Sequence, residues 1–143
     1  MIRNILIVTF LLLVNIQAGF VRDSALKVVK DTTTCLVWQD DSASKTVKKT
    51  WEDAIDYCED LSFAGFDDWR LPNINELNGI VDRSKYNPAI GSAFSNVATD
   101  YYWSSTTDFS DIKYAWVVYF DYGYGYWSVK ENETHVRCVR IGQ

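Results

Sequence analysis

The residues best suited to bind a ligand lie in an aromatic stretch near the carboxyl end of the chain. Tyrosines alternate with glycines across residues 121–127, so their side chains cannot all enter one core. Exposed aromatic rings suit stacking on the apolar face of a sugar, and they also mark protein interfaces. The candidate ligand-binding set is Tyr101, Tyr102, Asp121, Tyr122, Tyr124, Tyr126 and Trp127. The alternative is that half of these rings simply pack over a small sheet.

A second string of polar and aromatic residues lies at positions 65–77, and its residues 68–72 could be mistaken for a catalytic cluster. We predict a structural role instead. Trp69 is expected to fill the core, and Arg70 to form charge-assisted hydrogen bonds with Asp68 or with loop carbonyls. Glu76 is expected to cap a helix. The structural set is Asp68, Trp69, Arg70, Leu71, Pro72 and Glu76.

The usual components of nucleophilic catalysis are missing from the sequence. His135 is the single histidine, and no Ser–His or Cys–His arrangement is visible. No C-x-x-C pair occurs either, so a zinc site of the usual ligand spacing is not available. The sequence therefore predicts a protein that is not an enzyme and has no catalytic residues.

Acidic residues in predicted loops offer the hard oxygen ligands that calcium prefers. They are Asp40, Asp41, Asp67, Asp68, Asp108 and Asp111. However, no D-x-D-x-D-G spacing occurs, and paired acids on loops are usually solvated. We therefore predict no cofactor and no metal, with calcium as the alternative.

Charge and the first residues limit the partners. The chain has 14 basic and 19 acidic residues, a net charge of −5, which argues against a nucleic-acid partner. Arg3, the apolar run 5–16 and Ala18 predict a secretory signal peptide over residues 1–18, cleaved after Ala18. The run is shorter than the ~20 residues that cross a bilayer. We expect no stable membrane span after cleavage, and one domain over residues 19–143.

Two helices are predicted from apolar residues at helical spacing. The first follows Thr50, which with Asp53 resembles a capping box, and its apolar face includes Trp51, Ala54, Ile55, Cys58 and Leu61. The second follows Pro72, with Asn73 and Glu76 as its capping pair. Residues 40–49 are predicted to form a loop.

Strands are predicted on either side of these helices. Residues 27–39 are typical of a strand and turn, and from position 101 the period changes to two. Four strands are expected, at 101–105, 114–120, 126–129 and 136–141, with a hairpin turn at 121–125. Two helices packed on a small, mainly antiparallel β-sheet, closed by an N-terminal strand, make an α+β domain.

Three cysteines lie after the signal segment, so one is left over in a chain bound for an oxidising compartment. A bridge between Cys58 on the first helix and Cys138 in the last strand would close a loop of about 80 residues. Such a bridge contributes about 4 kcal/mol on the chain-entropy model. The alternative is two buried thiols, and export favours the bridge. Cys35 is then unpaired.

Five motifs follow one another in the order of a known family. They are residues 29–39 (VKDTTTCLVWQ), 51–58 (WEDAIDYC), 65–77 (GFDDWRLPNINEL), 102–106 (YWSST) and 136–140 (VRCVR). The pattern, over about residues 27–142, resembles the Lcl C-terminal domain family, named for the C-terminal domain of the Legionella collagen-like adhesin. Cys35 stands where that family usually has glycine.

The resemblance implies a C-type-lectin-like fold in which Cys58 and Cys138 match the helix-to-last-strand disulfide. It also implies a role in bacterial adhesion or at the envelope, with the protein secreted, periplasmic or associated with the outer membrane. We therefore expect an exported, non-catalytic module that recognises a glycan or a surface protein. The alternative is a structural or assembly protein of the envelope, a homo-oligomer joined through its aromatic surface or through Cys35.

Overall fold

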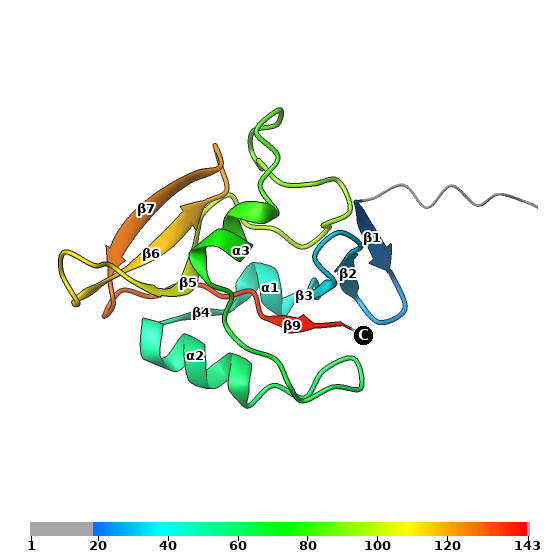
Figure 1. Ribbon diagram of the computed structural model, residues 1–143, viewed down its shortest axis with the longest axis horizontal. Coiled ribbons are helices and arrows are strands. Elements are labelled where there is room, and N and C mark those ends of the chain that lie inside the picture. The colour runs from blue at the N-terminus through cyan, green and yellow to red at the C-terminus, as the bar shows by residue number, and fades with distance from the viewer. Residues whose placement is uncertain (1–18, 143) are drawn as a thin grey trace, which may run out of the picture.

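The computed structural model describes residues 19–142, and the predicted signal peptide lies outside them. Within this range the chain forms two antiparallel sheets and three helices (Figure 1). The first sheet has the order β1-β2-β3-β9, with the bounds Phe20–Asp23, Val28–Asp31, Leu36–Gln39 and Val139–Ile141. The second has the order β4-β8-β5-β6-β7, with the bounds Lys48–Lys49, Thr134–His135, Tyr101–Thr107, Tyr114–Tyr119 and Tyr124–Val129.

The α+β class is confirmed, but the prediction of a single sheet is wrong. Of the predicted last strand, 136–141, only the end forms a strand, β9, which belongs to the first sheet; the two residues just before the predicted segment form β8, which belongs to the second sheet. His135 in β8 forms one parallel bridge to Tyr102 of β5, whereas β9 pairs with β3 through Val139 and Trp38. The segment between β8 and β9 is buried, so it passes through the core from one sheet to the other.

The two predicted helices are present as α2 (Trp51–Glu59) and α3 (Ile74–Gly79). The capping box of α3 is confirmed: Asn73 Oδ1 accepts the Glu76 N–H at 2.9 Å, and Glu76 accepts the Asn73 N–H at 2.8 Å. Thr50 is the N-cap residue of α2, as predicted, but the capping box is wrong, because the Thr50 side chain forms no capping hydrogen bond. A further short helix, α1 (Ala43–Thr46), lies in the segment predicted as loop.

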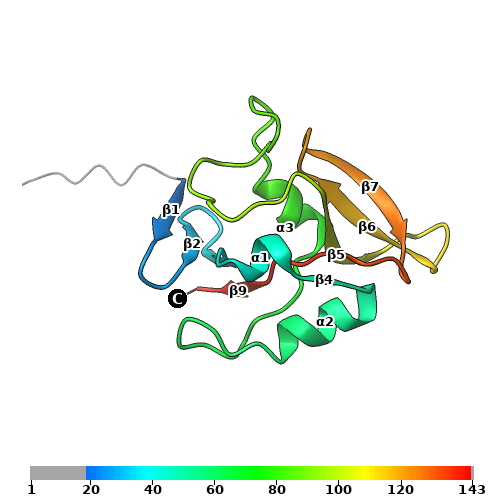
Figure 2. The same ribbon diagram turned by 180° about the vertical axis from the view of Figure 1, so that it is seen from behind.

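Strands β5 and β6 are covered by a helix on each face (Figure 2). Trp103 and Val117 pack in one buried cluster with Ala54 and Cys58 of α2. The neighbouring residues along each strand, among them Tyr102, lie in a second cluster with Leu77 of α3. Because successive side chains of a strand point to opposite faces, these two strands supply the centre of both cores.

Cys58 and Cys138 form the predicted disulfide, with Cα atoms 5.5 Å apart, and it joins α2 to the residue before β9. Cys35 is free and exposed, and it adopts a left-handed backbone conformation with φ of +62°. Its N–H donates to the Asp31 carbonyl at 2.9 Å, which closes the turn between β2 and β3. The turn thus needs the conformation that glycine adopts most easily.

Candidate functional site

Four tyrosine rings meet on the face of the second sheet that also bears Val117. Tyr101 of β5 stacks on its cross-strand partner Tyr119 of β6 with ring centroids 4.5 Å apart. Tyr126 of β7 lies edge-on to these rings, with centroids at 6.0 and 6.4 Å. Tyr122 in the turn contacts Tyr119 at 6.2 Å. We call these four residues the tyrosine cluster.

Strand alternation explains why the tyrosine cluster reaches solvent. Val117 and Tyr119 lie two residues apart on β6 and therefore on one face. Val117 is fully buried in the α2 core, whereas Tyr119 is half-buried and Tyr126 opposite Val117 is 43% exposed. The cover by α2 therefore ends between these positions, and the aromatic face continues beyond it. Tyr124, opposite Tyr119 on the edge strand, is 58% exposed.

The carboxylate of Asp121 lies beside the tyrosine cluster. The Tyr119 hydroxyl donates to Asp121 Oδ2 at 3.3 Å. Desolvation, followed by the charge of Asp121, raises the pKa of Tyr119. The phenol therefore stays protonated at neutral pH. Within residues 19–142 the second Asp121 oxygen accepts no hydrogen bond, so it can accept one from a ligand hydroxyl. The turn here depends on Gly123, which has φ of +80° and donates its N–H to the Tyr119 carbonyl at 2.7 Å.

The prediction that Tyr102 belongs to the exposed set is wrong. Tyr102 points to the opposite face from Tyr101 and is fully buried against Phe120 at a centroid distance of 5.2 Å. Its hydroxyl accepts the Ala98 N–H and donates to the Ser44 carbonyl, both at 2.8 Å. Every group that Tyr102 could offer a ligand is used inside the protein.

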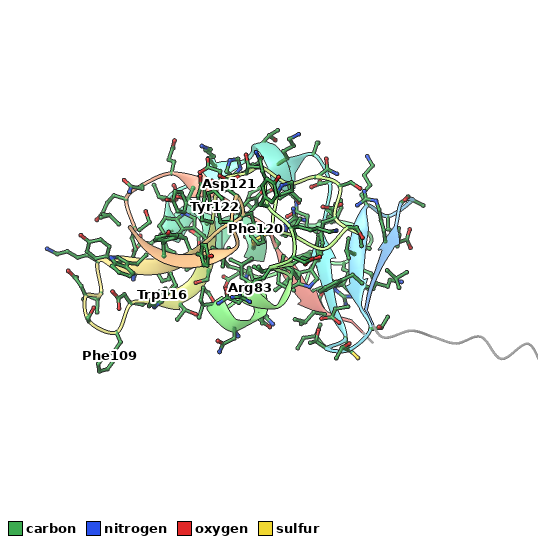
Figure 3. All side chains as sticks on the ribbon, turned by 90° about the horizontal axis from the view of Figure 1, so that it is seen from above. Arg83, Phe109, Trp116, Phe120, Asp121 and Tyr122 are labelled. Carbon is green, nitrogen blue, oxygen red and sulfur yellow. A yellow bond between two sulfur atoms is a disulfide. The ribbon has the colours of Figure 1, made fainter. Side chains whose placement is uncertain are left out.

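Trp127 also lies on the face opposite the tyrosine cluster. It is 57% exposed and forms a T-shaped pair with its cross-strand partner Trp116, with centroids 5.7 Å apart. The pair borders a cleft of about 400 Å³, which we call the tryptophan cleft, lined by Asp108, Ser110, Asp111, Tyr114, Trp116 and Trp127. Figure 3 shows Trp116 well apart from Asp121 and Tyr122. The structure thus brings the predicted residues together in two groups.

The sequence-based set missed Tyr119 and Trp116. Both lie on β6, which was predicted as a strand but whose aromatic residues were not considered as ligand contacts. The hairpin sequence contained a usable signal. When strand residues are paired one by one from the turn at Gly123, Tyr119 falls opposite Tyr124 and Trp116 opposite Trp127. Cross-strand pairing could therefore have found both residues.

The charged side chains of the string at 65–77 pair within the protein. Of the two partners predicted for Arg70, a loop carbonyl is present, that of Leu71 at 3.5 Å, whereas Asp68 is not; the main partner is Glu76, in a two-pronged ion pair with both bonds 2.8 Å long. These hydrogen bonds lower the pKa of Glu76. Asp68 instead accepts from Arg140 at 2.6 and 3.1 Å. Trp69 is buried, as predicted.

Asp40, one of the candidate calcium ligands, is fully buried. Its carboxylate accepts from Arg137 at 2.9 Å, from Arg22, and from the N–H groups of Ser95 at 2.9 Å and Asn96 at 3.2 Å. This carboxylate is therefore committed to protein donors. Within residues 19–142, no three Asp, Glu, His or Cys side chains are grouped so that they could hold a metal ion.

His135 is buried and is not part of either aromatic surface group. Its ring stacks on Tyr102 with centroids 5.2 Å apart, and Nε2 lies 3.4 Å from Asp100 Oδ2. Burial, followed by the charge of Lys48, lowers the pKa of His135. The side chain is therefore neutral at pH 7 and contributes to packing between β8 and β5.

The chain matches the model of the family described as the Lcl C-terminal domain over residues 27–140. No curated protein matches the chain. None of the helices in the described part of the chain has the length and apolar character needed to cross a membrane.

Proposed function

Because the chain belongs to the Lcl C-terminal domain family, we propose that it is a non-catalytic binding module that recognises a carbohydrate or a protein surface through the tyrosine cluster. The family is associated with an adhesin, which supports a role outside the cell or at the bacterial envelope. The observation behind the proposal is the aromatic face that continues past α2, with Tyr126 43% and Tyr122 57% exposed.

The chemistry of the tyrosine cluster suits both classes of partner. Tyrosine rings supply large, rigid contact area at low conformational cost, and their hydroxyls donate and accept hydrogen bonds. A sugar presents the complementary combination of an apolar C–H face and a rim of hydroxyls. Asp121 lies within reach of such a rim, since it already accepts from Tyr119.

Charge favours neutral ligands. The chain has a net charge of −5, and no basic side chain belongs to the tyrosine cluster. Affinity for sulfated glycans depends largely on Lys and Arg, so we expect neutral sugars or a protein surface. Strong, salt-sensitive binding to heparin would contradict this expectation.

A glycan array tests the proposal, and it should be run with calcium and with chelator. The matched variant replaces by alanine the two most exposed rings of the cluster, Tyr122 and Tyr126, and also Tyr124, which lies opposite Tyr119 on the edge strand. We expect it to weaken binding by about tenfold or more, since aromatic anchors at interfaces each contribute about 1–2 kcal/mol. Thermal stability should change little, because all three side chains are exposed.

Tyr86→Ala is the control, because Tyr86 is 77% exposed and lies outside the cluster. It should bind as the unmodified protein does. A folded triple variant with unchanged binding would refute the site. A blank array would remove the carbohydrate form of the proposal and direct the same variants to screens against surface proteins. Binding that is lost in chelator would indicate calcium.

We also propose that the fold is C-type-lectin-like, as family membership implies. Its support is the disulfide from α2 to the residue before the last strand. An experimental structure, compared with C-type lectin domains, tests this directly. A different order of strands around β5 and β8 would refute it.

A further inference from the structure

The tryptophan cleft lies on the sheet face opposite the tyrosine cluster and has a different chemistry. Its walls are aromatic: Trp116 and Trp127 meet at 79° with centroids 5.7 Å apart, and Tyr114 lies beside them. Trp127 is more than half exposed, so an indole face is available to a ligand. Such a face carries the negative part of the ring quadrupole and attracts cations.

Two carboxylates complete the lining, and the loop between β5 and β6 holds both of them. Asp108 accepts from the Ser110 N–H at 3.1 Å and from the Ser110 hydroxyl at 3.0 Å. Asp111 accepts the Lys113 N–H at 3.0 Å. Two backbone bonds of 2.9 and 3.0 Å join Asp108 and Asp111 to Tyr114 and close the loop.

Neither carboxylate is neutralised within residues 19–142. The ion pairs found there do not include Asp108 or Asp111. Of the nearby lysines, Lys130 is directed elsewhere, donating to Thr107 at 2.9 Å and lying 3.8 Å above the Trp51 ring. Lys113 is exposed in the same loop, so the lining retains more negative than positive charge.

We propose that the tryptophan cleft binds an organic ammonium ion. An indole wall with adjacent carboxylates stabilises a large, weakly hydrated cation, both by cation–π attraction and by charge. A small hydrated metal ion would gain little from the indoles, and an anion would be repelled by the aspartates. The loop that carries Asp108 and Asp111 also exposes Phe109 fully, at the outer edge of the molecule in Figure 3, and Ile112 to 77%, so an alkyl chain on the cation would find apolar contacts on this loop.

Choline and its neutral isostere 3,3-dimethylbutan-1-ol distinguish charge from shape. Binding is read from the indole N–H signals of the 15N-labelled protein. The chain has six tryptophans, so each signal can be assigned from the one that disappears in a Trp→Phe variant. We expect choline to shift the Trp116 and Trp127 signals, and the isostere to bind about tenfold or more weakly. Equal affinity for both compounds, or no shift with choline, would overturn the proposal.

Three further probes identify the source of the ammonium group. n-Butylammonium represents a lysine side chain of a protein partner, and phosphocholine represents a lipid headgroup. If the partner presents lysine, butylammonium should bind at least as tightly as choline. Phosphocholine should bind more weakly than choline, because its phosphate is repelled by the carboxylates of Asp108 and Asp111. Tighter binding of phosphocholine would refute the role assigned to these carboxylates. Calcium should shift neither indole signal.

Variants separate the cleft from the tyrosine cluster. Asp108→Asn with Asp111→Asn should weaken choline binding and leave the weak affinity for the isostere unchanged. Trp127→Ala should abolish both. The alanine replacements at Tyr122, Tyr124 and Tyr126 lie on the other face and should leave choline binding intact. Loss of choline binding in that triple variant would refute two separate sites.

Discussion

Replacement of Asp40 by asparagine should destabilise the protein more than almost any other single polar substitution. The change keeps the side-chain shape but removes the charge that Arg137, fully buried, relies on. It also places an amide NH₂ against donors, since both carboxylate oxygens accept bonds: Oδ1 from Arg137 and Asn96, and Oδ2 from Arg22 and Ser95. At least one donor then faces another donor.

The magnitude follows from the burial of the pair. Removing one partner of a buried ion pair costs about 3–5 kcal/mol, because the remaining charge is left uncompensated. Arg137 keeps two acceptors, the carbonyls of Gln39 at 2.6 Å and Asn96 at 2.5 Å, which places the expected loss toward the lower end of that range. A domain of this size has a total stability of about 5–15 kcal/mol, so the loss is a large fraction.

Urea unfolding, followed by circular dichroism, measures this loss as a lower midpoint at unchanged m-value. Asp121→Asn is the control, since within residues 19–142 the Asp121 side chain makes one hydrogen bond, of 3.3 Å, and the effect of the substitution should stay within about 0.5 kcal/mol. A loss below about 1 kcal/mol for Asp40→Asn would show that water reaches Arg137 or that the buried network is not as described.

Two further substitutions have defined expectations. Cys35→Gly should raise the free energy of unfolding by up to about 1 kcal/mol, because a left-handed residue with a side chain costs about 1–2 kcal/mol, partly offset by the flexibility of glycine when unfolded. Cys35→Ala should give no gain in the free energy of unfolding. If the protein runs as a dimer on non-reducing electrophoresis and either variant abolishes that dimer, a subunit contact through this thiol is supported. Hydrogen bonds from Arg70 lower the pKa of Glu76 below its ordinary value of 4.5, so the stabilisation by this pair is complete above that pH and is lost as the pH falls through the lowered value. The stability difference between the protein and Glu76→Gln should therefore shrink in acid; a constant difference from pH 7 to pH 3 would contradict the ion pair.

Local periodicity was enough to predict α2, α3 and the strands β5, β6 and β7 of the second sheet, because each depends on residues close in sequence; the two-residue strands β4 and β8 were not predicted. To predict which face of the sheet each aromatic residue occupies, the exact end of the hairpin turn is also needed. The turn ends at Gly123, so Tyr124 and the residue after it belong to β7 rather than to the turn. Because neighbouring strand residues face opposite ways, Tyr126 joins the tyrosine cluster while Trp127 joins the tryptophan cleft.

The role of Asp40 could not be predicted from its neighbours in sequence. Its partners Ser95, Asn96 and Arg137 are 55, 56 and 97 positions away. Likewise, the membership of β9 in the first sheet depends on its pairing with β3, a contact across most of the chain. Such contacts are set by tertiary packing, which local pattern does not report.

The disulfide determines how the protein would respond to a pulling force. A load applied between residues 19 and 142 runs along the chain to Cys58, crosses the covalent bridge to Cys138 and leaves through β9. The 80-residue span enclosed by the bridge is then outside the path of tension and cannot be extended while the bond is intact. Tyr101, Tyr126 and both tryptophans of the cleft lie within that span. Stretching would therefore strip β1 and β9 from the first sheet before it could pull either aromatic surface apart.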